Sequence, residues 1–171
     1  MIPHILSKED ISLDLATKGK HSALSRIAVR IARRSGLGEQ MVLCSLLHRE
    51  FLGSTGIGHG VAIPQALFDT ISSPVASFTR LAPPIDCDGP DDDPVEIVYT
   101  LLWPCSAVSA FLPALSQVCR VLRAPRTRGG LRQAQSAGEV TAILDDPRPT
   151  ISTNSHTCLL GMVMPRQLSN A

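Results

Sequence analysis

The sequence predicts a single α/β domain: a sandwich in which a mixed sheet of four to five strands is flanked by helices on both faces. Segments with helical spacing of apolar residues alternate with short apolar runs that suit strands. The run over 96–103 is nearly continuously apolar, as expected of a central strand buried on both faces. The length of 171 residues suits one domain and is too short for two. We expect this domain over 1–149 and a C-terminal extension over 150–171, where no period is clear.

Apolar residues at i, i+3, i+4 and i+7 predict the helices, and glycine or proline separates them. Arginines fill the opposite side of the first helix, which makes it amphipathic. In the third helix Pro113 is expected near the first turn, where a missing N–H costs least. The predicted helices cover 22–34, a segment ending near Glu50, 108–122, 127–135 and 137–144.

Three apolar runs are too short for helices and predict strands: 60–64, 75–81 and 96–103. Pro83-Pro84 is expected to close the second strand. The acidic run over 86–94 is rich in turn residues and predicts an irregular connection. It lacks the register of oxygen ligands, the sixth-position glycine and the distal glutamate of an EF-hand loop, so a solvated turn is favoured over a Ca²⁺ site.

Charge and cysteine content limit the classes of partner. Lys and Arg number 16 against 15 Asp and Glu, a net charge of +1, which gives no electrostatic case for nucleic acid or a membrane surface. No apolar run approaches the roughly 18 residues that span a bilayer, so no membrane insertion is expected. The five cysteines form no CxxC pair and lie mostly in apolar runs, which indicates reduced core residues in a cytoplasmic protein.

A glycine-rich loop over 53–65 is the most informative segment. Glycines let backbone N–H groups approach an anion closely, so such a loop suits a phosphate. Its spacing matches neither the Walker pattern, which needs Lys and Ser or Thr after the last glycine, nor the dinucleotide fingerprint G-x-G-x-x-G. No cofactor is therefore expected. Histidines and cysteines show no metal-ligand spacing, so no metal site is expected either.

The stretch Arg49-Glu-Phe-Leu-Gly-Ser-Thr-Gly-Ile-Gly-His-Gly-Val-Ala-Ile-Pro-Gln65 resembles the signature of fructose/mannitol-type IIA proteins of the sugar phosphotransferase system, especially the nitrogen-regulatory branch. The resemblance extends more loosely from Ile11 to Asp146. It implies one cytoplasmic bacterial α/β domain that receives a phosphoryl group on histidine. The implied partners are proteins: a small histidine phosphocarrier (HPr- or NPr-like), a sensor kinase, or the regulatory target of a transporter.

This sequence departs from the family at the positions that carry the chemistry. Gln65 stands where the family keeps its phosphoacceptor histidine, and an amide nitrogen has no lone pair available for attack. A second family histidine assists at the phosphoryl group, and the resemblance places Phe111, or its neighbour Leu112, in that position. A phenyl ring neither hydrogen-bonds nor titrates as imidazole does, so both roles are expected to be lost.

The rest of the site is retained. By resemblance the phosphate-binding residues are Arg49, Ser54, Thr55, Gly56 and Gly58. A guanidinium suits a phosphate or carboxylate, although a surface ion pair with Glu50 explains Arg49 as well.

His59 stands where the family usually has asparagine. It either accepts the phosphoryl group in place of Gln65 or makes the loop hydrogen bonds of an asparagine.

Three functions of the protein are compatible with these residues. The first is a regulatory protein-binding module that has lost its phosphoacceptor. The others are an active phosphocarrier using His59, and a domain that senses an anionic metabolite.

Overall fold

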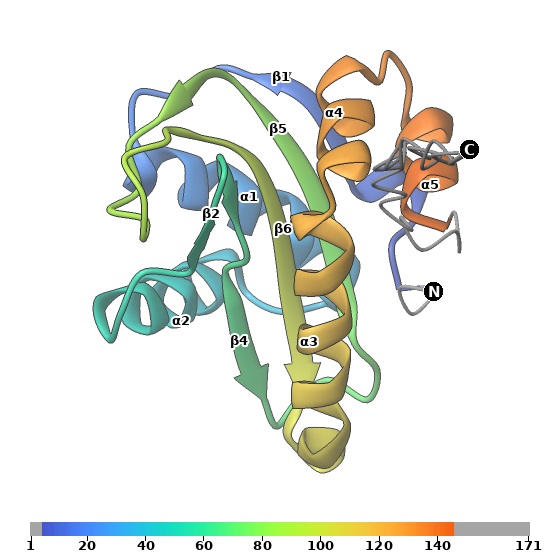
Figure 1. Cartoon of the computed structure of the whole chain (residues 1–171). Helices are drawn as coiled ribbons and strands as arrows, with labels where there is room; N and C mark the ends of the chain where they lie inside the picture. Colours follow the sequence, from blue (N-terminus) through green and yellow to red (C-terminus); the bar gives the residue numbers. More distant parts are fainter. Residues whose placement is uncertain (1–4, 146–171) are drawn as a thin grey trace, which may run out of the picture.

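The computed structural model describes residues 5–145, and in this part a six-stranded sheet lies between two layers of helices (Figure 1). The expected sandwich is confirmed, with one strand more than the upper bound expected. The predicted extension over 150–171 lies outside the described residues. In chain order the elements are η1 (Lys8–Asp10), β1 (Ile11–Leu15), α1 (Lys20–Ser35), α2 (Glu39–Phe51), β2 (Gly56–Gly58), β3 (Val61–Ala62), β4 (Gln65–Phe68), β5 (Val75–Ile85), β6 (Val95–Pro104), η2 (Cys105–Ala107), α3 (Val108–Arg123), α4 (Pro125–Gln133) and α5 (Ala137–Asp145).

The sheet is mixed and is organised around β6. Its order is β1-β5-β6-β3-β2, and β4 also pairs with β6. β5 runs antiparallel to β6, whereas β3 and β4 run parallel to it along the same edge. β3 pairs with Ile97 and Val98, and β4 begins again at Leu101 opposite Gln65. The N–H of Leu101 donates to the Pro64 carbonyl (2.9 Å), which bridges the break between the two short strands.

Side chains of β6 alternate between two cores, because successive residues of a strand point to opposite faces. Ile97, Tyr99 and Leu101 pack with Val118 and Leu122 of α3 and with apolar residues of α4 and α5. On the opposite face, Leu102 packs with Ile31 of α1 and with Val42 and Leu46 of α2, and Val98 packs with Ile27 of α1. This two-sided burial explains the continuous apolar character of 96–103.

All predicted helices are present, with boundaries shifted by a few residues. Gly36 ends α1 at a φ of 72°, a left-handed conformation that glycine adopts without a steric cost. Pro113 was expected in the first turn of its helix, but it is the sixth residue of α3. Pro113 and Ser109, whose carbonyl loses its usual partner, are both exposed. The Ser109 carbonyl is therefore accessible to solvent, which lowers the cost of the missing hydrogen bond.

The strand predictions were incomplete. β5 does not stop at Pro83-Pro84 but continues to Ile85, with a register shift against β6 after Arg80 and a cis Ala82–Pro83 bond. β1 was not expected, the run over 60–64 contains only the two-residue strand β3, and β4 begins directly after that run at Gln65, where no strand was expected. The acidic run over 86–94 is irregular, as predicted.

Arg80 holds one end of the sheet to α4. Its side chain is buried (7% exposed), and Nε and Nη2 donate to the two carboxylate oxygens of Asp14 at 2.9 and 3.0 Å. Nη1 donates to the carbonyls of Leu131, Arg132 and Ala134 at 2.7 to 3.1 Å. This hydrogen bonding with Arg80 lowers the pKa of Asp14. The guanidinium thus ties β5 to β1 and to the end of α4.

The burial of the cysteines and the length of one apolar helix differ from what composition predicted. Among the described cysteines, which are free thiols, Cys87 is buried and Cys119 is partly buried against the core, but Cys44 is exposed and Cys105 is only partly buried, so the expected placement in the core was wrong for Cys44. Within residues 5–145, the segment Cys105–Arg123 is the one helical stretch long and apolar enough to cross a membrane by length and composition. Phe111, Ala114, Val118 and Leu122 form one buried face of α3, as expected of an amphipathic helix that packs on a sheet.

Candidate functional site

An open cleft of about 590 Å³ lies between α2, β4 and the start of α3. Helix α2 packs on β4, and both β4 and α3 pack on β6, so three segments distant in the sequence meet here. The lining residues are Cys44, Ser45, His48, Arg49, Leu52, Gln65, Ala66, Leu67 and Phe111. The cleft therefore brings together Arg49, Gln65 and Phe111, three of the residues singled out from the sequence.

Arg49 and Gln65 contact each other in this cleft. Arg49 lies in the last turn of α2, and its Nη1 donates to the Gly53 carbonyl (2.8 Å). With the Gln65 amide oxygen facing Arg49, that oxygen accepts from Nε at 3.2 Å and from Nη2 at 3.3 Å, while the amide nitrogen donates to the Ile63 carbonyl. In this orientation the guanidinium faces a neutral oxygen. Both the oxygen and the nitrogen of the Gln65 side-chain amide then have hydrogen-bond partners within the protein.

Phe111 forms the wall of the cleft on the α3 side. It is 9% exposed, and its ring centroid lies 5.8 Å from that of Trp103, with the two rings tilted by 55°. Its neighbour Leu112 is 67% exposed and does not line the cleft. Of the two residues proposed for the assisting position, only Phe111 contributes to this site. Its contact with Trp103 gives the ring a packing role.

Thr55 and Glu50 form an internal connection behind the glycine loop. The side chain of Glu50 is 8% exposed, and one oxygen accepts from the Thr55 N–H (3.0 Å) and from Thr55 Oγ1 (2.5 Å). Its other oxygen lies 3.2 Å from Nζ of Lys20, which also contacts Asp88 at 2.8 Å. Burial opposes the charge of Lys20, but hydrogen bonds with the two carboxylates outweigh it and raise the pKa of the ammonium group. Glu50 thus pairs with Lys20, and not with Arg49.

The other polar groups of the loop are also used internally. Ser54 Oγ donates to the Cys87 carbonyl (3.0 Å) and accepts from the Gly56 N–H (3.2 Å). Gly58 has a φ of 87°, and a Cβ there would lie 2.9 Å from Oδ2 of Asp91, so a carboxylate already lies against it. Ser54, Thr55, Gly56 and Gly58 therefore remain predictions as phosphate-binding residues. None of them lines the cleft that holds Arg49 and Gln65.

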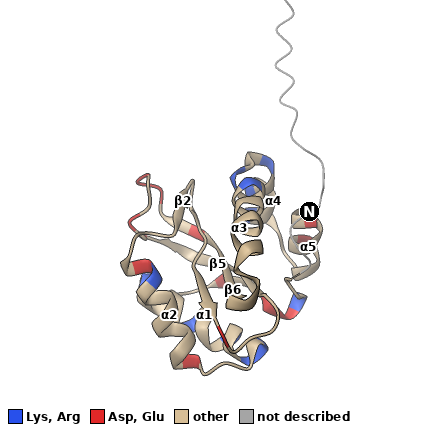
Figure 2. Ribbon diagram, turned by 90° about the horizontal axis from the view of Figure 1, so that it is seen from below, with Lys and Arg blue, Asp and Glu red and all other residues tan. Residues whose placement is uncertain are grey.

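His59 lies outside the cleft, on the turn between β2 and β3. Its N–H donates to Asp91 Oδ2 (2.7 Å), and its carbonyl accepts from Arg132 Nη2 (2.9 Å). Figure 2 shows the acidic loop between β5 and β6 beside β2. Carboxylates next to His59 repel a phosphoryl group, and these surroundings do not favour His59 as an acceptor.

Two cleft residues were missed from the sequence. Cys44 and His48 lie one helical turn apart on α2, and both line the cleft beside Arg49. Their spacing of four residues, ending one residue before Arg49, was the available signal.

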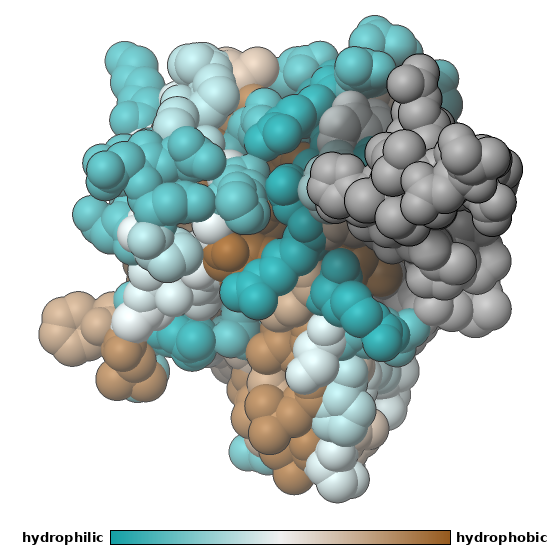
Figure 3. Space-filling view, in the orientation of Figure 1, coloured by the Kyte–Doolittle hydropathy of each residue, from teal (hydrophilic) through white to brown (hydrophobic). Residues whose placement is uncertain are grey.

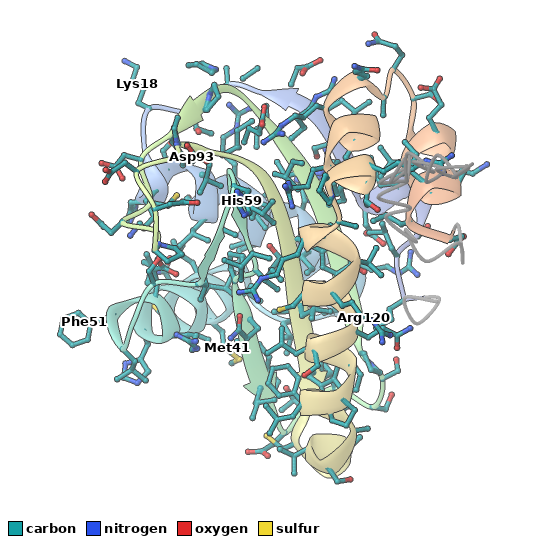
Figure 4. All side chains as sticks on the ribbon, viewed as in Figure 1. Lys18, Met41, Phe51, His59, Asp93 and Arg120 are labelled. Atoms are coloured by element: carbon teal, nitrogen blue, oxygen red, sulfur yellow. The ribbon has the colours of Figure 1, made fainter. Side chains whose placement is uncertain are left out.

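Exposed apolar side chains surround this cleft. Figure 3 shows apolar surface over the N-terminal part of α3 and at the end of α2. The members of this apolar rim, each at least 42% exposed, are Met41 on α2, Leu52 directly after α2, Leu67 on β4, and Val108 and Leu112 on α3, whereas Phe51 lies outside the rim. Phe51 projects away from the domain (Figure 4). A rim of this kind around a polar centre is typical of a protein-binding site.

Comparison with known proteins agrees with the resemblance in the loop. The family described as "Phosphoenolpyruvate-dependent sugar phosphotransferase system, EIIA 2" matches residues 4–146. A nitrogen regulatory protein of Bradyrhizobium diazoefficiens is 34% identical over 149 residues, which cover 87% of this chain and 97% of that protein. The nitrogen regulatory protein of Escherichia coli is 34% identical over 148 residues, or 85% and 90% of the two chains.

Solved structures of IIA proteins have the same fold as this chain. The nitrogen regulatory protein IIA-Ntr of Neisseria meningitidis superposes with a TM-score of 0.79 and 34% identity, covering 82% of this chain and 96% of that one. The mannitol IIA protein of Escherichia coli, solved in complex with phosphorylated enzyme IIB, superposes with a TM-score of 0.69 at 18% identity, covering 81% and 95%. That likeness supports the fold. The chain therefore belongs to the EIIA type 2 family of the phosphotransferase system, and its relatives include nitrogen regulatory proteins.

Proposed function

We propose that this protein is a cytoplasmic regulatory module that acts by binding other proteins and does not carry a phosphoryl group on Gln65. The observation that carries the proposal is the state of the cleft centre, where Arg49 meets Gln65, the residue that the resemblance aligns with the family's acceptor histidine. With its amide oxygen facing Arg49, Gln65 accepts from the guanidinium at 3.2 and 3.3 Å, and its amide nitrogen donates to the Ile63 carbonyl. The lone pair of a carboxamide nitrogen is delocalised into the carbonyl group, so this nitrogen cannot attack a phosphoryl group.

The surroundings support the same function. Phe111 fills the position proposed for the assisting histidine and packs on Trp103. The apolar rim is exposed around the cleft. Exposed apolar surface of this kind suits the binding of another protein and is not explained by phosphoryl transfer at Gln65. Because Gln65 is uncharged and stays unmodified, the surface keeps the charge of an unphosphorylated family member. We infer that its partners recognise this state: a histidine phosphocarrier, a sensor kinase or the regulatory part of a transporter.

A phosphotransfer experiment tests the loss of acceptor chemistry. The full chain is incubated with a histidine phosphocarrier, its kinase and labelled phosphoenolpyruvate, and acid-labile label on the chain is measured. We expect none. A functional type 2 IIA protein in the same reaction is the positive control. Acid-labile label on this chain would overturn the proposal, and loss of that label in His59→Ala would identify the phosphocarrier alternative.

The binding half is tested with purified candidate partners and with surface variants. Leu67 is 42% exposed and lines the cleft, whereas Phe51 is 87% exposed and does not. We expect Leu67→Asp to weaken binding by more than about tenfold, since a charge is then buried in an apolar contact. Phe51→Asp is the matched control and is expected to change affinity less. Equal affinity of Leu67→Asp and the unmodified chain would exclude this face as the contact.

A further inference from the structure

A second group of ligand-type side chains lies outside the cleft, where the β2–β3 turn meets the loop between β5 and β6. His59, Asp91 and Asp93 each place one ligand atom within 4.8 Å of the ligand atoms of the other two. His59 and Asp93 are labelled in Figure 4 and come from different segments on the same side of the domain. The residues are too far apart in the sequence for a spacing pattern to have shown this group.

The backbone of these two loops is held in place by neighbouring contacts. Asp91 Oδ2 accepts from the His59 N–H at 2.7 Å, and Arg132 Nη2 donates to the His59 carbonyl at 2.9 Å. Gly60 brings the turn against the start of β6, because its carbonyl accepts from the N–H groups of Glu96 and Ile97, each at 3.0 Å. The imidazole of His59 is thus carried on an anchored turn facing the acidic loop.

One carboxylate oxygen of this group has no hydrogen-bond partner within residues 5–145. Asp91 Oδ1 is buried and has no hydrogen-bond partner there, although Oδ2 of the same carboxylate is satisfied. In that part of the chain neither Asp91 nor Asp93 forms a salt bridge. The nearby cations are already paired, Lys20 with Glu50 and Asp88, and Arg132 with Glu96. A buried carboxylate oxygen without a donor is costly, and a bound cation removes that cost.

We propose that His59, Asp91 and Asp93 bind a divalent transition-metal ion of the zinc type, with water completing its coordination. An imidazole nitrogen favours zinc and its neighbours in the transition series over Ca²⁺ and Mg²⁺, which prefer oxygen ligands alone. Ligand bonds of about 2.0–2.2 Å place adjacent ligands roughly 3.5 Å apart in a tetrahedron. The exposed side chains of His59 and Asp93 reach that spacing by rotating. The bound ion links the β2–β3 turn to the loop between β5 and β6.

The test is a calorimetric titration of Zn²⁺ into the full chain after removal of metal by a chelator. We expect one saturable site, and more than about a tenfold loss of affinity in His59→Asn and in Asp93→Asn. Asparagine tolerates the positive φ of 57° at position 59. His21→Asn, which removes an exposed histidine of α1 outside the group, is the matched control and should bind as the unmodified chain does.

Location and folding are measured in parallel. In ¹H–¹⁵N spectra we expect Zn²⁺ to shift the amide signals of 58–60 and 91–93, not those around the thiol of Cys44. Saturating Zn²⁺ should raise Tm by about 5 °C in the unmodified chain and by much less in the two variants. Their Tm in chelator should equal that of the unmodified chain. Absence of saturable binding, unchanged affinity in both variants, or amide shifts located elsewhere would overturn the proposal.

Discussion

Two arginines mark two regions of this domain with opposite character. Arg80 is 7% exposed and donates to Asp14 and to three carbonyls of the α4 end. Arg49 is half-buried at an open cleft, where it donates to the Gly53 carbonyl and faces the Gln65 amide. One guanidinium holds elements together, whereas the other borders a surface with exposed apolar residues. We therefore expect Arg80 to contribute more to stability than Arg49, which borders the proposed binding surface.

The largest effect is expected from replacing the two arginines in turn. Arg80→Met removes every hydrogen bond of the guanidinium and leaves the carbonyls of Leu131, Arg132 and Ala134 without a donor, so we expect the free energy of unfolding to fall by about 3–5 kcal/mol. Arg49→Met should change it by less than about 1 kcal/mol. Urea denaturation at neutral pH measures both. Equal losses in the two variants would contradict the contrast.

A smaller loss is expected at the connection behind the glycine loop. Thr55→Val removes the 2.5 Å hydrogen bond from Oγ1 to Glu50 while keeping the shape of the side chain, and we expect a loss of about 1.5–3 kcal/mol. Thr55→Ser keeps the hydroxyl and serves as the control, with a smaller change. If Thr55→Val is as stable as Thr55→Ser in urea denaturation, the loop is not held through Glu50.

The contribution of the Asp14–Arg80 pair to stability is expected to depend on pH. Because the pKa of Asp14 is lowered in the folded state, its stabilisation is complete above the unfolded pKa of about 3.9 and is lost as pH falls through the folded pKa. Asp14→Asn should therefore be less stable than the unmodified chain at pH 7, and the difference should narrow towards pH 2. Thermal unfolding across this range tests it. A difference that is constant with pH would rule out a role for the Asp14 charge.

The last prediction concerns the reactivity of two thiols and not stability. Burial raises the pKa of the Cys87 thiol to about 11, so it holds little thiolate at pH 8, whereas Cys44 is exposed in the cleft. We expect iodoacetamide to modify Cys44 at least about 100-fold faster than Cys87, as followed by peptide mass spectrometry. A bound partner should protect Cys44. Comparable rates at the two thiols would show that the glycine loop opens readily over Cys87.

The sequence was sufficient for the helices and the central strand, because their apolar periodicity reflects burial directly. It was insufficient for β4, whose four residues pair in parallel with β6 from Gln65 onwards. A strand so short carries too little pattern, and its pairing depends on contacts distant in the sequence. The same limit applies to β5, where Pro83-Pro84 ended the prediction although the strand continues to Ile85 beside a register shift.

Within the candidate site, only the residues that belong to one continuous stretch of sequence could be predicted. Arg49 and Gln65 come from the glycine-loop signature, and the structure brings them into one cleft with Phe111. The partners of Glu50 and His59 were not predictable, because Lys20 and Asp91 reach them through the folded arrangement of α1 and the acidic loop. Composition suggested that the loop amides bind an anion. The structure shows carboxylates already placed beside several of them.

The packing of α5 against η1 and β1 has a practical consequence for assay design. It brings both ends of the described chain to the β1 edge of the sheet, while the cleft lies by β4 beyond β6 (Figure 1). A fluorophore or affinity handle attached near residue 5 or 145 is therefore separated from the cleft by the width of the sheet. Immobilised or labelled protein should leave the recognition face accessible.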